Sequence, residues 1–258
     1  MSSLECGLDF GPLVRGAFVR RENRFRTRVR LEEGGGPVAA YLPNPGRLEE
    51  LLTPERVVLL RPAPLSSQRR TAYDLLLVDA DGVWVSVDSR LPNLLVEKLL
   101  RCGALAGFEP HAHVHREVTR GESRLDFMLT DGEASRCWLE VKSVTLVEER
   151  TAAFPDAPTK RGRRHLRDLR AAVEAGERAV VLFVVQREDA VRFAPHDATD
   201  PAFGTVLREV ARAGVEVRAL RCRVSPQGIR PLGELPVVLE SRSFPTSSGG
   251  FEREFSYR

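Results

Sequence analysis

The sequence predicts a two-domain α/β protein, in which a region of short strands that permits a small β-barrel precedes a region of alternating helices and strands. The first third of the chain consists of short strand-like segments separated by Gly, Pro and charged turns. After Asp88, helical and strand-like segments alternate. The chain has 258 residues, enough for two domains of ordinary size, and its 42% hydrophobic and 29% charged residues are typical of a folded protein.

The expected first domain covers residues 1–87. It contains five or six short strand-like segments, and Asp81-Gly82 is a strong hairpin signal between the last two. Residues 45–52 are the only part of it that suggests a helix. This number of short strands permits a small closed barrel of the OB type. The expected strands are residues 17–21, 25–31, 37–41, 56–61, 73–78 and 83–87.

The expected second domain covers residues 88–240. A helical pattern opens at Pro92 and stops before Gly103, and three strands follow it. The continuous apolar run at 178–186 is typical of a strand buried on both faces, and the next helix and strand predict a parallel pair. Residues 241–258 have the composition of a flexible tail. The other expected elements are strands 111–119, 124–130, 137–147 and 215–224, and helices 162–175 and 201–213.

The cysteines show neither CxxC pairing nor regular spacing, which argues against a disulfide framework or a zinc knuckle. Reduced thiols in a cytosol are the simplest account of Cys6, Cys102, Cys137 and Cys222. No apolar run is long enough for a signal peptide or a membrane span. We therefore expect a cytoplasmic protein with no membrane partner.

The net charge of +3 is only mildly basic, so charge alone does not identify a nucleic-acid-binding protein. Arg greatly outnumbers Lys, and the planar Arg side chain binds phosphate bidentately. A GC-rich genome that favours Arg codons is an alternative explanation of the same bias.

The most informative feature is a pair of charged strands in the second domain. Asp126 alternates with apolar residues in the first strand, and Glu140 and Lys142 alternate with apolar residues in the second. If the two strands form a hairpin centred at residue 133, Asp126 lies opposite Glu140, with Lys142 on the same face. The sequence thus predicts that two carboxylates and an ammonium group converge at one end of a strand pair.

Such a cluster needs a chemical reason, because adjacent carboxylates repel and are costly to bury without a cation. A hard divalent cation such as Mg²⁺ suits oxygen ligands, polarises a phosphodiester and lowers the pKa of a bound water. Lys142 would orient or deprotonate that water, or neutralise charge developing on the phosphate. The alternative is an exposed cross-strand salt bridge, which is common on hairpins.

The element order and the Asp…Glu-x-Lys pattern resemble the PD-(D/E)xK nuclease superfamily, whose core has the order αβββαβ. Leu125 stands where the superfamily name has Pro, so this half of the motif rests on Asp126 alone. In that superfamily the preceding helix often adds an acidic residue, and Glu97 is the candidate metal ligand here. An i,i+4 pair with Arg101 on a solvated helix face explains Glu97 about as well.

A closer resemblance over nearly the whole chain rests on the ordered segments RENRF (21–25), LPNPGRLEELL (42–52), YDLLLV (73–78), VDSRLPNLLVEKLL (87–100), SRLDFML (123–129), LEVKSVTL (139–146), FPDAPTKRGRRHLRDL (154–169) and AVVLFVVQR (179–187). These segments resemble the sugar fermentation stimulation protein (SfsA) family. The resemblance implies an OB-type N-terminal domain, a restriction-endonuclease-like C-terminal domain, nonspecific DNA binding and a DNA or RNA nuclease. Asp126, Glu140 and Lys142 match the positions expected to be catalytic in that family.

Two further motifs concern phosphate and nucleic acid. Arg161 and His165 share one helical face with Asp168, and they could hold a phosphate with help from the helix N-terminus. The alternative is a charged outer helix face. In LPNPGRL, a tight turn presents Arg47, and a basic groove with an aromatic for single-strand stacking could form there. The alternative is a barrel corner with scattered surface arginines. The candidate residues of this groove are Arg15, Arg20, Arg21, Arg24, Tyr41, Asn44 and Arg47.

Three histidines, His111, His113 and His115, share one strand face, which invites a zinc interpretation. No carboxylate or Cys lies at a fitting local spacing. A row of exposed or packed histidines is therefore the favoured account.

Together these observations predict a Mg²⁺- or Mn²⁺-dependent phosphodiesterase that acts on DNA or RNA with little sequence preference. Asp126 and Glu140 would hold the metal, with help from Glu97. The alternative is a nucleic-acid-binding regulator whose nuclease-like fold is catalytically idle. A homodimer stays open, because many nucleases of this class act as dimers. The sequence does not distinguish DNA from RNA, single from double strands, or internal from terminal cutting.

Overall fold

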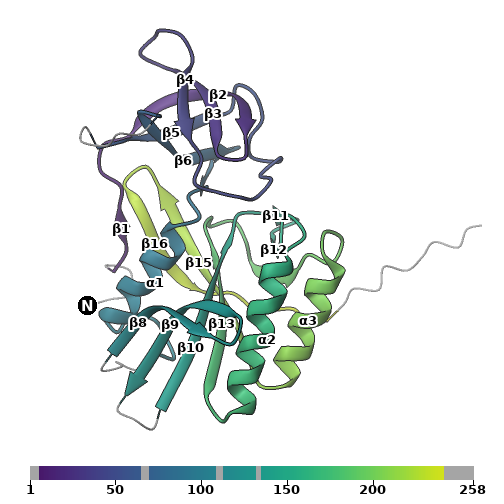
Figure 1. Ribbon diagram of the computed structural model, residues 1–258. Coiled ribbons are helices and arrows are strands. Elements are labelled where there is room, and N and C mark those ends of the chain that lie inside the picture. Colours follow the sequence, from purple (N-terminus) through teal and green to yellow (C-terminus); the bar gives the residue numbers. More distant parts are fainter. Residues whose placement is uncertain (1–5, 65–69, 109–112, 132–134, 241–258) are drawn as a thin grey trace, which may run out of the picture.

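The computed structural model describes residues 6–64, 70–108, 113–131 and 135–240, and it contains two domains (Figure 1). A small barrel lies above a larger domain with a seven-stranded sheet. The expected tail at 241–258 lies outside the described residues. Within the described ranges, no helix is long and apolar enough to cross a membrane.

The N-terminal domain is a closed five-stranded β-barrel of the OB type, as predicted. Parallel pairing of β4 with β6, at Ala40 and Tyr73, closes the barrel. Buried apolar side chains such as Phe18, Val29 and Leu75 fill it. The strands are β2 (Val14–Asn23), β3 (Arg26–Leu31), β4 (Val38–Tyr41), β5 (Val57–Pro62) and β6 (Tyr73–Ala80), and β7 (Val83–Ser86) pairs with β6 as a hairpin.

The predicted helix at residues 45–52 is wrong. This segment forms turns, in which Leu51 N donates to Leu48 O at 3.1 Å. Leu48 has a φ of 55°, in the left-handed region that interrupts a right-handed helix. Both leucines are buried in the barrel core. The apolar spacing that suggested a helix therefore reflects a loop whose side chains fill the barrel.

The larger domain is organised around a sheet with the strand order β1-β16-β15-β13-β10-β9-β8. Strand β13 is parallel to both β10 and β15, whereas the outer pairs are antiparallel. The predicted parallel pair is thereby confirmed. The strands are β1 (Leu8–Asp9), β8 (His113–Arg120), β9 (Ser123–Asp131), β10 (Ser135–Val144), β13 (Arg178–Val185), β15 (Glu216–Ser225) and β16 (Gly228–Glu234).

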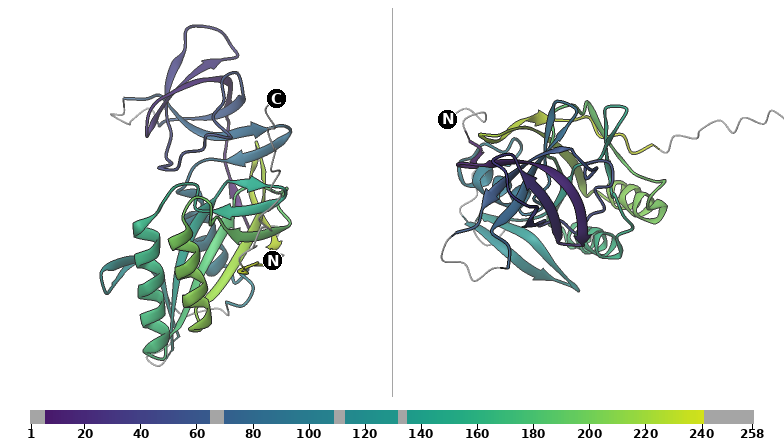
Figure 2. Two further views of the ribbon diagram at one scale, coloured as in Figure 1. Left: turned by 90° about the vertical axis from the view of Figure 1, so that its right-hand side faces the viewer. Right: turned by 90° about the horizontal axis from the view of Figure 1, so that it is seen from above.

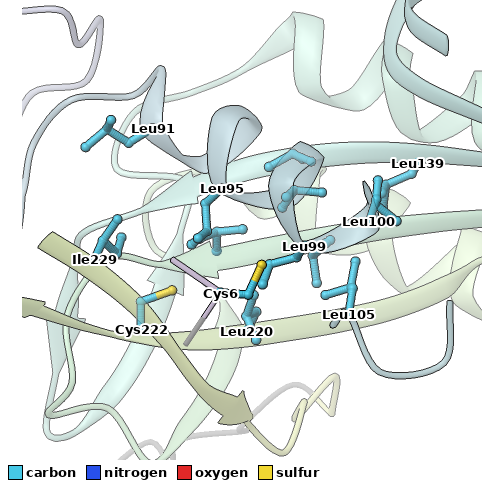
Figure 3. Packing of buried hydrophobic residues seen from close by; sticks show 14 of the residues in the cluster. Cys6, Leu91, Leu95, Leu99, Leu100, Leu105, Leu139, Leu220, Cys222 and Ile229 are labelled. Atoms are coloured by element: carbon cyan, nitrogen blue, oxygen red, sulfur yellow. The ribbon is translucent and has the colours of Figure 1, made fainter. Parts of the chain in front are cut away.

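Helices cover both faces of this sheet. On β13, Val180 and Leu182 belong to the core beneath α1, whereas Val181 and Phe183 belong to the core beneath α2 and α3. The strand is therefore buried on both faces, as its continuous apolar run predicted. Figure 3 shows the leucines of α1 packed over the sheet, and Figure 2 shows α2 and α3 side by side. The helices are α1 (Leu91–Arg101), α2 (Lys160–Glu174) and α3 (Pro201–Arg212).

A small second sheet in the larger domain was not predicted. It joins β11 (Val147–Glu148), β12 (Thr151–Phe154) and β14 (Arg192–Pro195). Segments of this length are too short to show a hydrophobic period. Its strand β12 leads into the loop before α2, so this sheet positions the start of that helix.

The start of the described chain belongs to the larger domain and not to the barrel. Strand β1 pairs with β16, and Cys6 forms a disulfide with Cys102 at the end of α1. Cys6 lies in the core beneath α1 (Figure 3). The expectation of reduced thiols is wrong for this pair. Nothing in the sequence indicated the pairing, because the two cysteines are 96 residues apart and form no local spacing pattern. Cys137 and Cys222 are free and buried. Residues 8–9, which lie within the range expected for the first domain, therefore pair in the sheet of the larger domain.

Candidate active site

The β9–β10 hairpin has the register that the sequence predicted. Phe127 pairs with Leu139, so the same register sets Asp126 opposite Glu140. The backbone N–H of Asp126 donates to Glu140 Oε2 at 3.3 Å, and the N–H of Val141 donates to Asp126 Oδ2 at 2.8 Å. The two carboxylates are therefore locked to each other's strand.

Glu140 is buried, with 2% of its surface exposed, and two side chains reach the same oxygen. The Lys142 ammonium and His165 Nδ1 both contact Glu140 Oε1. Arg161 Nε donates to His165 Nε2 at 3.1 Å, so this nitrogen is an acceptor and the proton lies on Nδ1. His165 therefore donates from Nδ1 to Glu140 Oε1, and the Lys142 ammonium contacts the same oxygen.

Asp126 is held from the other side by α1. Asn93, in the first turn of that helix, donates from Nδ2 to Asp126 Oδ1 at 2.6 Å. Glu97, the predicted metal ligand, lies one turn later and pairs with Arg101 at 3.0 Å and Arg116 at 2.7 Å. The structure thus brings Asn93 to the site and directs Glu97 to arginines instead. Asn93 was missed, although its place one turn before Glu97 on the same helix face could have indicated it.

The two carboxylates have opposite pKa shifts. Burial and the nearby charge of Glu140 raise the pKa of Asp126 to about 7. Burial also opposes ionisation of Glu140, but Lys142 and His165 outweigh it and lower the pKa of Glu140 to about 2. Near neutral pH, the site therefore contains one firmly ionised carboxylate and one that a cation would help to ionise.

The donor set suits a hard divalent cation. Asp126 and Glu140 offer only oxygen ligands, and burial together with the charge of Glu140 opposes the ionisation of Asp126, which a bound cation would favour. Within the described part of the chain, no group of three or more His, Cys, Asp or Glu side chains is placed to hold a metal. Two carboxylates completed by water and phosphate oxygens are a usual environment for Mg²⁺, and they do not suit a structural zinc site.

Helix α2 contributes three of the predicted residues in different ways. Thr159 caps the helix by accepting from the N–H of Gly162, and Arg161 is exposed in the first turn. His165 is 3% exposed with both ring nitrogens engaged, so it holds Glu140 rather than offering a donor to phosphate. Asp168 lies against Gly121 in the β8–β9 turn, where an added Cβ would be 2.7 Å from its Oδ1.

Both domains of this chain match known protein families. Residues 19–87 match the SfsA N-terminal OB domain, and residues 90–228 match the sugar fermentation stimulation protein RE domain. The chain belongs to the SfsA family. The family predicted from the sequence is thereby confirmed.

Several SfsA relatives are similar over most of their length. The sugar fermentation stimulation protein homolog of Moorella thermoacetica is 46% identical, over 88% of this chain and 97% of the relative. The homolog of Desulforamulus reducens is 45% identical, over 88% of this chain and 93% of the relative. The solved structure of Pyrococcus furiosus SfsA in complex with Ca²⁺ has a TM-score of 0.82 and 33% identity, and the match covers 90% of this chain and 98% of that one.

In this SfsA-family barrel, part of the predicted basic groove has a structural role. Arg21 donates to the backbone oxygens of the LPNPGR turn, including Gly46 O at 2.9 Å. Asn44 is buried, and its amide donates to Val87 O at 3.0 Å and accepts from Gly46 N at 2.8 Å. The Asn44 amide therefore holds the LPNPGR turn against the end of the barrel.

The other barrel candidates lie near the protein surface. Arg15 pairs with Glu32 at 3.7 Å, and Arg20 pairs with Glu22 at 3.4 Å. The backbone N–H of Arg47 donates to Asp156 Oδ2 at 2.9 Å, which ties the turn to the larger domain. Beside this link is a cavity of about 220 Å³, and its lining includes Arg24, Asn44–Gly46, Ser143–Leu146 and Ala153–Thr159.

The histidine row on β8 has no metal-binding geometry among its described members. His113 and His115 are exposed, with ring centroids 6.0 Å apart. His111 lies outside the described residues. The favoured account, a row of histidines on the strand surface, fits this arrangement.

Proposed function

We propose that this chain is a divalent-metal-dependent nuclease that hydrolyses phosphodiester bonds in DNA or RNA with little sequence preference. The observation that carries the proposal is the convergence of Asp126, Glu140 and Lys142 at one end of the β9–β10 hairpin. A surface salt bridge does not account for this cluster, because the side chains of Glu140 and Lys142 are largely buried.

Asp126 and Glu140 are the residues proposed to hold Mg²⁺ or Mn²⁺. Such a cation, when bound, polarises the phosphodiester and lowers the pKa of a coordinated water. The structure of Pyrococcus furiosus SfsA in complex with Ca²⁺ supports a hard, oxygen-preferring cation. In this chain, Asn93 orients Asp126, and His165 orients Glu140.

Lys142 and Arg161 are proposed to act on the substrate. The Lys142 side chain is 11% exposed, so its ammonium is desolvated and can neutralise charge that develops on the phosphate. Arg161 is exposed in the first turn of α2, where the helix N-terminus adds partial positive charge for an anion. The barrel, with Arg24 at the interdomain cavity, is proposed to guide the strand toward these groups.

A second candidate is a nucleic-acid-binding protein whose nuclease-like site is idle. One observation favours it, since the carboxylate oxygens of Asp126 and Glu140 are engaged by partners inside the protein. A metal would therefore have to replace some of these contacts. Catalysis and binding must be measured separately to distinguish the two candidates.

The test is to incubate wild type and the Glu140→Ala/Lys142→Ala variant with labelled single- and double-stranded DNA and RNA. Each mixture is measured with Mg²⁺, with Mn²⁺ and with EDTA. We expect metal-dependent cleavage by the wild type and a loss of at least about a hundredfold in the variant. Cleavage that survives in the variant excludes these residues as the centre. Binding without cleavage by both proteins favours the idle fold.

A further inference from the structure

An exposed Phe25 and a half-buried Tyr41 lie side by side in the barrel. Phe25 is 41% exposed at the β2–β3 turn, and its ring centroid lies 6.3 Å from that of Tyr41 at an interplanar angle of 35°. Within the described residues, the only other large hydrophobic side chains as exposed are Leu94 and Val191. The exposed ring of Phe25, beside a second aromatic ring, offers a rigid apolar contact surface to a ligand.

An arginine guanidinium lies over each ring of this pair. The Cζ of Arg24 lies 5.6 Å from the centroid of Phe25, and the Cζ of Arg90 lies 5.8 Å from the centroid of Tyr41. Arg90 is already held by Asp88 and Asp74, whereas Arg24 Nε donates to the backbone oxygen of Pro45 at 3.3 Å. Two neighbouring aromatic rings with a guanidinium beside each match a nucleobase with its phosphate.

The position of the pair links it to the candidate active site on two sides. Arg90 is the N-cap of α1, and Asn93, which holds Asp126, lies in the next turn, about 5 Å along the helix axis. Arg24 also lines the interdomain cavity that reaches Thr159, the N-cap of α2. A strand that contacts the aromatic pair therefore has short paths to both helix starts that frame the site.

We propose that Phe25 and Tyr41 form a stacking site for an unpaired base, so that the strand bound next to the active site is single-stranded. Bases in a duplex have both faces covered by their neighbours, and only an unpaired base offers a face to these rings. The inference that the cleaved strand is single-stranded rests on the proposed nuclease function. The stacking site itself, as a binding site for an unpaired base, does not depend on nuclease activity.

The test measures binding in EDTA, where cleavage is absent, by fluorescence anisotropy with labelled 12-nucleotide single-stranded DNA, single-stranded RNA and duplex DNA. Phe25→Leu should weaken single-strand binding about tenfold, because one base loses its aromatic partner. The dependence of affinity on salt should stay as in wild type, because no charge is removed. Duplex affinity should not change. The DNA and RNA arms show which sugar is preferred.

Two further proteins and one substrate make the test specific. Phe25→Trp should restore the affinity, and Val191→Ala, which removes a side chain of similar exposure (40%) outside the barrel, should bind as wild type. An oligonucleotide with abasic positions should bind wild type more weakly and Phe25→Leu almost unchanged. Equal single-strand affinity of wild type and Phe25→Leu overturns the stacking site, even if the protein cleaves. Absence of cleavage leaves this result intact and counts against the nuclease alone.

Discussion

Asp126 and Glu140 face each other across one hairpin, yet their surroundings give them different protonation behaviour. Glu140 has an ammonium and an imidazole N–H on one oxygen. Asp126 receives only neutral donors, from Asn93 and from the backbone of Val141. The Lys142 ammonium therefore stabilises the ionised form of Glu140, whereas burial disfavours the ionised form of Asp126.

The first prediction follows from Asp126. Its pKa in the folded protein, about 7, lies above the ordinary 3.8, so metal-free wild type should lose stability as pH rises through that interval. We expect a loss on the order of 2 kcal/mol between pH 5 and pH 8 in EDTA, measured by urea unfolding. Glu140 does not make the free energy of unfolding depend on pH in this range, because its pKa shift, from 4.5 to about 2, affects stability only at lower pH. Asp126→Asn, which keeps the size and can accept from Val141, should lack this loss. Identical slopes for both proteins would contradict the assignment.

The second prediction compares Asn93 with Glu97. Asn93→Ala removes the side chain that orients Asp126, so the Mn²⁺ concentration for half-maximal cleavage should rise about 10- to 100-fold. Glu97→Gln, one turn later on α1, should change this concentration less than about twofold, because Glu97 is paired with Arg101 and Arg116. The reverse order of the two effects would restore Glu97 as the metal ligand.

At the scale of elements, the starts of α2 and α3 are joined by one buried carboxylate. Asp200 caps α3 by accepting from the N–H of Phe203 at 2.9 Å. It also accepts from the N–H of Thr159 and from Arg163 Nη1, at 2.8 and 2.7 Å. The start of the helix that carries Arg161 is thus fixed by a residue of the next helix.

Asp200→Ala is therefore the third prediction. The change removes a helix cap and leaves Arg163, with an 18% exposed side chain, without its partner. We expect a loss of about 3–5 kcal/mol in the free energy of unfolding, measured in urea. Asp200→Asn can still cap α3, so it should lose less. A loss below about 1 kcal/mol for Asp200→Ala would show that the two helix starts are fixed by other contacts.

The elements with a clear hydrophobic period were predictable from the sequence, and those without one were not. The charged alternation around Asp126 and Glu140 specified the register, because a slip of one residue would reverse every side chain of a half-buried strand. The turn at Leu48 has the apolar spacing of a helix, and only its φ shows the difference. The partners of Glu140 and Asp126 on α1 and α2 depend on helix packing, which a single strand pair does not encode.

At the scale of the whole molecule, the part of the chain that the structure describes, from residue 6 to residue 240, begins and ends in the same domain. Strand β1 pairs with β16, and Cys6 is bonded to Cys102, so the barrel is inserted into the larger domain. The barrel is consequently connected at two places, before β2 and after β7. This closure could not be predicted from the sequence, because neither a two-residue strand nor a distant cysteine pair leaves a local pattern.

The fourth prediction concerns this closure. Reduction of Cys6–Cys102 should lower the free energy of unfolding by about 4 kcal/mol, because the unfolded chain regains the freedom of a 96-residue loop. The measurement is urea unfolding with and without a phosphine reductant. The Cys6→Ser/Cys102→Ser variant should not respond to the reductant, since Cys137 and Cys222 are free. A wild type that is equally insensitive would contradict a stabilising disulfide.

The Cys6–Cys102 bond also determines where mechanical tension travels. If the protein is pulled from its two ends, the covalent path passes from Cys6 across the disulfide to Cys102 and omits every residue between them. The barrel and α1 then bear no load, and an unfolding trace should lack their length. Reduction should release roughly 300 Å of additional extension, from the 96-residue separation at about 3.4 Å per residue. In the oxidised protein, the barrel can be pulled apart only by a force applied to the barrel itself.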